Sequence, residues 1–446
     1  MSGDLPIWRP QALREVSSDF DTPPGFKPLK LVGMGGLTGM KAELIEPISM
    51  ESLEDWKEVV GALQFWGEVP LPKSITKFTT EGTERGLVAF IETGEDWIAE
   101  FLPWGSDGML KARSRNAPEG SDVPLGGYTW NGKDIIILRK SISKGENSKD
   151  RLVKKLQEDD LDSCARILRD AGRCLGLFHS SMSALRELPP DQKRWNSRNE
   201  KIEGLLRAQF IWRAPYTKEQ PCTASLLDVR ISDFSGDTLR IGPPRLSDAL
   251  IPHESEKPAM RDLASLIHDL SRLLYEPIIE LDGQISTMDP SEETALRTSR
   301  KTLLERVQSR QKPLRLALID GWRETAPDEW ASDNAFYSHR GGMAIWEYEQ
   351  CLLDVLESSS NQSGAPQPAV ETLMHVKMYQ KKMFNNRTFA ALSFMSFFFG
   401  VSSLVNQFPP SLTQMVTPLA FLTVGFFCLR TYRRMAPPPE RPFTEI

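Results

Sequence analysis

The most extended feature of the hydrophobic pattern is residues 388–429, which contain no Asp, Glu, Lys or Arg. Two apolar runs, residues 388–408 and 412–429, are separated there by Pro409-Pro410-Ser411. At about 1.5 Å of rise per residue, each run is long enough for a helix to cross a hydrocarbon layer roughly 30 Å thick. The pattern predicts two transmembrane helices in a hairpin with Pro-Pro at its tip. The alternative, a buried hairpin of a soluble protein, would need a polar face, and the scattered Ser, Thr and Asn residues follow no helical period.

Upstream, strand-like segments come first along the chain. They lie at residues 29–32, 42–45, 86–92, 97–102 and 135–138, and one helical pattern covers residues 49–65. Asn131-Gly132 predicts a type I′ turn between residues 128–130 and 135–138. This part is therefore predicted to be a mainly antiparallel sheet with one helix.

Helical spacing takes over after residue 146. One apolar stripe predicts a long helix that starts near Leu161 and reaches Leu185, and further helices are predicted at residues 200–212, 260–275, 292–309 and 343–356. The fold class is therefore α+β. The predicted parts are an irregular arm (1–27), a sheet-rich N-lobe (28–145), a mainly helical C-lobe (146–357), a flexible linker (358–370), a basic juxtamembrane helix (371–387), the two spans (388–408 and 412–429) and a tail (430–446).

Charge is distributed unevenly along the chain. The net charge is -6, and it divides into -11 for residues 1–357 and +5 for the rest. Basic residues precede the first span and follow the second, and the loop between the spans is uncharged, so the positive-inside rule places both termini and the large N-terminal part in the cytoplasm. The basic collar suits anionic lipid head groups. The acidic N-terminal part argues against nucleic acid as a partner.

Cysteine and histidine give no sign of a metal site or a disulfide framework. The 5 cysteines and 5 histidines are widely spaced, without a CxxC or HExxH motif, which indicates reduced thiols in a cytosolic compartment. The first 21 residues are polar, so no cleaved signal peptide is expected and the C-terminal hairpin itself would direct the chain to the membrane.

Four short motifs follow one another in the middle of the chain. They are Leu175-Gly-Leu-Phe-His179, Ile231-Ser-Asp-Phe-Ser-Gly-Asp-Thr-Leu239, Arg245-Leu-Ser-Asp248 and Met260-Arg-Asp-Leu-Ala264. Coming after a sheet-rich region and a long helix, they resemble the protein-kinase-like superfamily, particularly the aminoglycoside phosphotransferase and choline kinase branch. The resemblance covers roughly residues 30–280 and implies a two-lobed kinase-like fold that uses ATP and Mg²⁺.

The resemblance also implies roles for individual residues. Asp233 takes the place of the catalytic base, Thr238 stands where the family has a magnesium-binding Asn, and Asp248 takes the place of the metal-binding Asp. Asp237 is a substitute ligand for the weakly coordinating Thr238. Asp262 matches the acidic residue at a helix start that braces the catalytic loop.

The departures from the family pattern leave alternatives open. Ile231 and Ser232 replace the His and Gly of the motif, and a rival register makes Asp233 the metal-binding Asp but leaves no acid near Pro215 for a base. Each residue also has a purely structural interpretation: Asp233 and Asp237 as turn formers, Asp248 as a loop carboxylate, and Asp262 as a first-turn charge. His179 fits a hydrogen-bonded core position better than a catalytic one.

The nucleotide-binding signal is a glycine-rich segment, Gly33-Met-Gly-Gly-Leu-Thr-Gly39. The backbone at Gly33, Gly35 and Gly36 could approach phosphate, although a tight turn between strands is the simpler explanation of the glycines. Lys111 is the best stand-in for the phosphate-binding lysine, and its alternative is a solvent-facing basic stripe.

Three hypotheses follow. The first is a membrane-anchored kinase-fold protein with poor or no phosphotransfer, a pseudokinase that senses nucleotide or binds an unidentified protein partner. The second is an active small-molecule or lipid-head-group phosphotransferase that uses Asp233 as base and Asp248 for Mg²⁺. The third is a membrane scaffold without a ligand.

Overall fold

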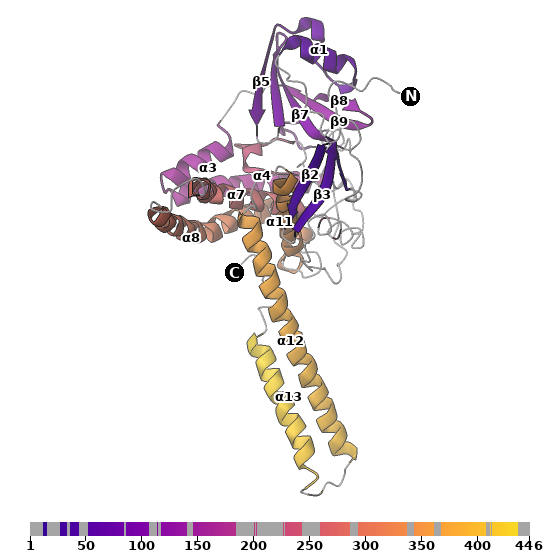
Figure 1. Ribbon diagram of the computed structural model, residues 1–446, viewed down its shortest axis with the longest axis vertical. Coiled ribbons are helices and arrows are strands. Elements are labelled where there is room, and N and C mark those ends of the chain that lie inside the picture. Colours follow the sequence, from indigo (N-terminus) through magenta and orange to yellow (C-terminus); the bar gives the residue numbers. More distant parts are fainter. Residues whose placement is uncertain are drawn as a thin grey trace. The chain divides into compact units, whose positions relative to one another are not determined.

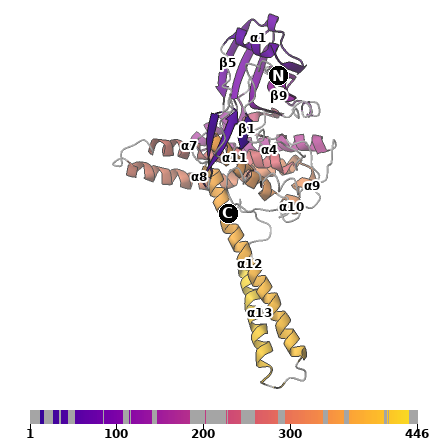
Figure 2. The same ribbon diagram turned by 45° about the vertical axis from the view of Figure 1, so that its right-hand side comes forward.

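The computed structural model describes residues 12–15, 27–33, 36–43, 52–83, 86–106, 114, 117–140, 146–183, 200, 202, 226, 228–242, 259–285, 293–336, 343–360, 367–406, 411 and 413–435. The chain divides into two compact units, Met1–Val370 and Glu371–Ile446, which are described separately. Figures 1 and 2 show the elements of each. The predicted α+β class is confirmed, because antiparallel sheets and helices share the first unit.

The first part of unit 1 contains two antiparallel sheets where the sequence predicted one. The smaller sheet has the order β1-β3-β2, from β1 (Ala12–Glu15), β2 (Lys27–Gly33) and β3 (Gly36–Glu43). The larger has the order β4-β8-β9-β7-β6-β5, from β4 (Gln64–Gly67), β5 (Lys77–Thr83), β6 (Gly86–Glu92), β7 (Asp96–Ser106), β8 (Gly126–Trp130) and β9 (Lys133–Lys140). A short 3₁₀ turn, η1 (Pro72–Ser74), lies between β4 and β5.

The hairpin turn predicted at Asn131-Gly132 is confirmed. Trp130 pairs with Lys133, and the two residues between them have φ angles of 49° and 77°. Type I′ turns require positive φ at both central positions, which Asn and Gly tolerate best.

Helix α1 (Leu53–Gly61) covers one face of the larger sheet and is shorter than the predicted residues 49–65. Ser52 and Asp55 form a capping box that fixes its start, and the chain enters β4 soon after its end. Trp56 is fully buried and meets Phe101 and Tyr128 edge-on, with ring centroids 6.0 and 5.8 Å away. These contacts form the core of the sheet-rich part.

The helical part of unit 1 follows β9. Its elements are α3 (Ser148–Gln157), α4 (Leu161–Ser183), η2 (Ile231–Asp233), the hairpin β10 (Phe234–Ser235) and β11 (Thr238–Leu239), α7 (Met260–Ile285), α8 (Glu293–Thr325), α9 (Asp328–Ala331), α10 (Asp333–Phe336) and α11 (Met343–Ser360). The predicted helix at residues 200–212 lies almost wholly outside the described residues. Helix α8 runs well past the predicted end at residue 309 and through Pro313, because Leu314, Leu318 and Trp322 are buried along its second half.

Helices α4 and α8 pack with their backbones in close contact. A Cβ atom on Gly172 would lie 2.2 Å from the carbonyl oxygen of Leu318, and one on Gly321 would lie 2.1 Å from that of Arg169. Only glycine fits at these two positions. The close approach brings Trp322 on α8 within hydrogen-bonding distance of His179 on α4.

Unit 2 contains α13 (Val416–Met435) and all of α12 (Gln367–Asn406) except its first four residues, and the two helices lie side by side. The Ser393 hydroxyl donates to the carbonyl of Gly425 at 2.9 Å. Within the described residues, one helical segment, Arg387–Asn406, is long and apolar enough to span a membrane. Helix α13 begins four residues later than predicted, because residues 413–415 form a turn, so its uncharged part is only residues 416–429 and the second span remains a prediction.

Candidate functional site

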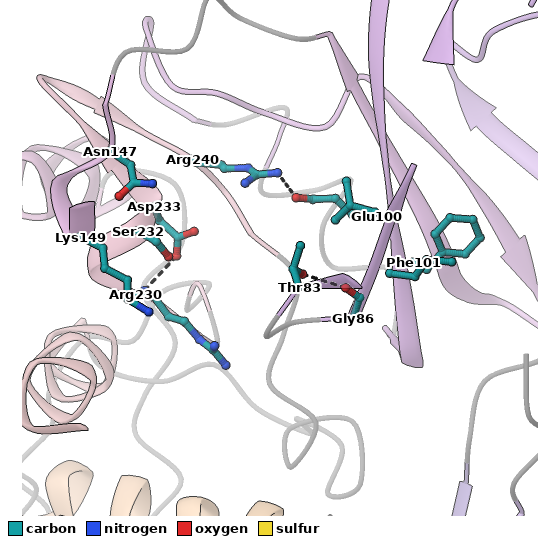
Figure 3. A pocket seen from close by; sticks show the side chains of 12 residues that line it. Thr83, Gly86, Glu100, Phe101, Asn147, Lys149, Arg230, Ser232, Asp233 and Arg240 are labelled. Carbon is teal, nitrogen blue, oxygen red and sulfur yellow. Dashed lines mark hydrogen bonds and ion pairs between the residues drawn. The ribbon is translucent and has the colours of Figure 1, made fainter. Parts of the chain in front are cut away.

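A cavity of about 280 Å³ lies between the larger sheet and the helical part of unit 1 (Figure 3). The sheet contributes Thr83, Gly86, Leu87, Val88, Glu100 and Phe101 to its lining. The other side is lined by Asn147, Lys149, Arg230, Ser232, Asp233 and Arg240. Both signs of charge therefore face the same space.

Strand alternation places Glu100 on this side of the sheet. Successive side chains of a strand point to opposite faces, and Ala99 and Phe101 of β7 pack in the core with Trp56. Glu100 and Leu102 point to the opposite face, toward the helical part. Leu102 packs there in the hydrophobic core that the helices form. A buried carboxylate at such a position requires a partner.

The partners of Glu100 are two arginines. Arg139 on β9 is 1% exposed in its side chain and lies 3.0 Å from Glu100 and 3.2 Å from Asp122. Arg240, which directly follows β11, pairs with the other carboxylate oxygen of Glu100. Two guanidinium groups and two carboxylates thus neutralise one another in a partly buried cluster, which we call the Glu100 cluster.

The Glu100 cluster ties the strand after the β10–β11 hairpin to the sheet. Arg139 donates to the carbonyl of Ile241 at 2.6 Å and to that of Asp122 at 3.1 Å. Asp122 and Arg240 form a parallel bridge, with Asp122 N donating to Leu239 and Ile241 N donating to Asp122. The sheet-derived wall and the loop-derived wall of the cavity are therefore held together by buried ionic contacts.

One face of α7 holds the loop that carries the opposite wall. The backbone N–H groups of Leu226, Val229 and Ile231 donate to the side chains of Asp262, Ser265 and Asp269 at 2.8, 3.2 and 2.8 Å. The three acceptors lie three and four residues apart and therefore share one helix face. The role of Asp262 as the residue that braces the loop is confirmed for the N–H of Leu226.

His179 is a buried, hydrogen-bonded core residue, as predicted. Its Nδ1 accepts from the indole N–H of Trp322 at 2.9 Å, and its Nε2 lies 3.2 Å from Asp262 Oδ2. An indole N–H can only donate, so Nδ1 carries no proton and the proton on Nε2 faces the Asp262 carboxylate. His179 thereby orients the carboxylate that braces the loop.

Asp233 lines the cavity, but one of its carboxylate oxygens accepts a hydrogen bond from the nearby backbone. It is 3% exposed, and its Oδ2 accepts from the N–H of Arg230 at 2.9 Å, closing the 3₁₀ turn η2. The Asp233 carbonyl also accepts from Arg240 N at 2.7 Å. The turn-forming interpretation and the cavity-facing one therefore apply to the same residue.

Two other predicted metal ligands, Asp237 and Thr238, lie in the β10–β11 hairpin. Asp237 is in the turn of the β10–β11 hairpin, Thr238 begins β11, and neither is among the described residues that line the cavity. The carbonyl of Asp237 accepts from the thiol of Cys174 at 3.3 Å, and burial raises the pKa of that thiol to about 11, so it stays protonated at neutral pH. Asp248 lies outside the described residues. In the parts of the chain that the structure describes, no three His, Cys, Asp or Glu side chains come together to hold a metal ion.

The predicted nucleotide-binding glycines close a hairpin of the smaller sheet. Gly33 pairs with Gly36 across the β2–β3 turn, and neither is among the described residues that line the cavity. Gly35 and Lys111 lie outside the described residues. A different hairpin reaches the cavity: Thr83 and Gly86 pair where β5 meets β6, and the Thr83 hydroxyl donates to the Gly86 carbonyl at 2.8 Å.

The sequence analysis missed Glu100, Arg139 and Arg240. A signal existed for Glu100, because it is a charged residue inside the apolar stretch of β7, whereas Arg139 directly follows the apolar run of β9 and is next to its end. Arg240 gave no such signal, since its partner is 140 residues away in the chain.

No protein-family model matches the chain, and no curated protein sequence matches it. Among solved structures it is similar to a glucosamine kinase in complex with glucosamine, ADP and inorganic phosphate, at 10% identity and a TM-score of 0.43, covering 77% of this chain and 91% of that one. It is also similar to a glucosamine kinase in crystal form A, at 12% identity and a TM-score of 0.45, covering 76% and 87%. Likenesses this distant carry no argument about activity.

Proposed function

We propose that this chain is a membrane-anchored protein of kinase-like fold whose cavity binds a phosphate-bearing small molecule, such as a nucleotide, without efficient phosphotransfer. It would act as a nucleotide-sensing or partner-binding module. The proposal rests on the lining of the cavity and on the membrane-type surface of unit 2.

The order of the elements supports the kinase-like part of the proposal. Strands β5, β6 and β7 form a meander, and the β5–β6 hairpin overhangs a cavity whose opposite wall is a loop followed by a short hairpin. In protein kinases a hairpin covers the nucleotide phosphates, a lysine on the third strand contacts them, and an Asp after the catalytic loop holds Mg²⁺. Glu100 and Arg240 occupy the corresponding strand and the corresponding segment here.

The proposal depends on the charges at these two positions, because each has the opposite sign to the residue of a phosphotransferase at the corresponding place. The third strand presents a carboxylate where a phosphotransferase presents a lysine, and the segment after β11 presents a guanidinium where a phosphotransferase presents a metal-binding carboxylate. Three cations line the cavity, Lys149, Arg230 and Arg240, of which Arg230 also pairs with Asp228 and Arg240 with Glu100. Such a site favours phosphate through direct contacts with cations and does not need Mg²⁺ to bridge them.

Membrane anchoring is proposed from unit 2. Large apolar side chains on α12 and α13 are widely exposed, among them Phe394 at 72% and Phe427 at 67%. Soluble proteins rarely expose so much contiguous apolar surface, and a bilayer would cover it. With basic residues at both ends of the hairpin, the positive-inside rule assigns unit 1 and both termini to the cytoplasm.

Thermal unfolding of the detergent-solubilised full chain tests the proposal. A ligand at 100 times its Kd stabilises the native state by about 2.7 kcal/mol. ATP should raise the unfolding midpoint equally with Mg²⁺ and with EDTA, and Lys149→Gln should reduce the rise while Lys301→Gln, a distant exposed control, should not. If the unfolding midpoint does not rise at ATP concentrations up to millimolar, the proposal is wrong and the hypothesis of a membrane scaffold without a ligand replaces it.

An active small-molecule or lipid-head-group phosphotransferase is the second candidate. Asp228 and Asp233 have the spacing of the Asp and Asn in the kinase catalytic loop, which would make Asp228 the base and Asp233 a metal ligand. However, Asp228 is 4% exposed, pairs with Arg230 at 3.0 Å, and is not among the described residues that line the cavity. Turnover that is lost in Asp233→Ala would establish this candidate over the first.

A further inference from the structure

A second cavity, of about 310 Å³, lies between α3 and α4 on the surface of unit 1. Arg151, Lys154 and Lys155 of α3 line it, opposite Ser163, Arg166, Ile167 and Asp170 of α4, and Glu146, which precedes α3, completes the lining. We call it the α3–α4 groove. None of these residues lines the cavity that contains Asp233, which α3 reaches through Lys149.

Helix geometry explains why the charges converge. On α3, positions 151, 154 and 155 share one face, and on α4 positions 163, 166 and 170 share another, because residues three and four apart are neighbours on a helix. The opposite faces are anchored in the core, where Leu152 and Leu168 are fully buried. Both helices are therefore held so that their polar faces form the two walls of one groove.

The cations of the groove are only partly neutralised. Lys155 pairs with Glu158 at 2.5 Å, and Arg166 donates to the Ser163 hydroxyl at 2.8 Å. The side chains of Arg151 and Lys154 form no hydrogen bond or ion pair with any residue in the described part of the chain. Four cations outnumber the two carboxylates that line the groove, in a region, residues 1–357, whose net charge is -11.

We propose that the α3–α4 groove is a second anion site, which binds a small molecule carrying several phosphate groups. Lys and Arg side chains from two rigid helices suit clustered phosphates, because each can donate charge-assisted hydrogen bonds to a different oxygen. The volume is that of a small-ligand pocket rather than of an extended binding face. The Ser163 hydroxyl adds a neutral donor at the same wall.

Titration of the detergent-solubilised full chain with inositol hexakisphosphate tests this site. The double variant Arg151→Gln/Lys154→Gln should raise the Kd about tenfold or more, because two charge-assisted contacts are lost. The matched control, Lys301→Gln/Lys312→Gln on α8, removes the same charge from an exposed surface and should leave the Kd within about twofold. All four residues are solvent-accessible, so both variants should fold normally.

The source of the phosphates is resolved by repeating the titration in micelles that contain phosphatidylinositol bisphosphate. Loss of inositol hexakisphosphate binding in those micelles would assign the groove to a lipid head group, and unchanged binding would assign it to a soluble polyphosphate. The proposal is overturned if inositol hexakisphosphate does not bind, or if both double variants weaken its binding equally. It is also overturned if polyglutamate binds more tightly than inositol hexakisphosphate and its binding depends on Arg151 and Lys154 in the same way. None of these results bears on ATP binding at the Asp233 cavity, which Lys149→Gln tests separately.

Discussion

Arg240 and Glu100 stand 140 residues apart in the chain and form an ion pair at the cavity beneath the β5–β6 hairpin. Arg139 contacts the same carboxylate from the neighbouring strand. A single glutamate thus joins the sheet to the segment after β11. This relationship leads to predictions about both stability and ligand binding.

Glu100→Gln should destabilise the protein by about 3–5 kcal/mol, because two arginines lose their shared counter-charge in a buried site. Arg240→Gln should cost less, about 1 kcal/mol, since its side chain is 33% exposed. Denaturant unfolding of both single variants and the double variant measures the coupling. Additivity of the two free energies within about 0.5 kcal/mol would show that the pair contributes nothing.

Asp269→Ala should cost about 1–3 kcal/mol, because the N–H of Ile231 would lose its acceptor in a partly buried loop. It should also weaken ATP binding, since the loop carries Ser232 and Asp233 at the cavity. Asp320→Ala, an exposed aspartate on α8, is the control and should change neither quantity measurably. Equal effects from the two variants would contradict the loop-bracing role of α7.

Trp322→Phe should destabilise the protein more than Trp56→Phe does. Trp322 donates its indole N–H to His179, whereas the buried indole nitrogen of Trp56 meets no acceptor within the described structure. Both substitutions remove similar apolar area, but only the first leaves a buried acceptor unpaired, at about 1–3 kcal/mol. Urea unfolding of the two variants compares them directly, and a larger loss in Trp56→Phe would contradict the assigned hydrogen bond.

Stability should fall as the pH rises from about 10 to 12, in part because of Tyr128. Burial raises the pKa of this phenol from 10.0 to about 12, so the unfolded chain loses the proton first. Between these two pKa values the native state binds more protons than the unfolded chain. The contribution of Tyr128 to the free energy of unfolding is therefore complete below pH 10 and is lost as the pH rises through the folded pKa. Tyr128→Phe should remove roughly 2–3 kcal/mol of this decline, measured as the difference between the two unfolding profiles. Parallel profiles would show that Tyr128 does not contribute.

Local patterns predicted much of the fold. The Asn131-Gly132 turn, the β6–β7 hairpin and the start of α7 at Met260 follow from turn chemistry and periodicity, which act within a few residues. Helix α8 was predicted only as far as residue 309, because the burial of Trp322 and its neighbours, which extends the helix through Pro313, depends on tertiary packing.

The candidate site was predictable only in part. Asp233 was found from a motif and does line the cavity, while Asp237 and Thr238 of the same motif fall in a hairpin turn away from it. The Glu100 cluster depends on pairing across the sheet and on a contact between distant segments, which no local pattern specifies. A charged residue on a buried strand face indicates that a partner exists without identifying it.

The cavity is proposed to bind phosphate without needing magnesium and without transferring it. Equilibrium binding of ATP to the detergent-solubilised full chain, measured with Mg²⁺ and with EDTA, followed by a single-turnover assay for phosphate release or transfer, tests this proposal most directly. We expect the same Kd in both buffers and no turnover, because the proposed function assigns Arg240 to the segment that carries the metal-binding carboxylate of a kinase. Binding that requires Mg²⁺ and leads to turnover would contradict the account.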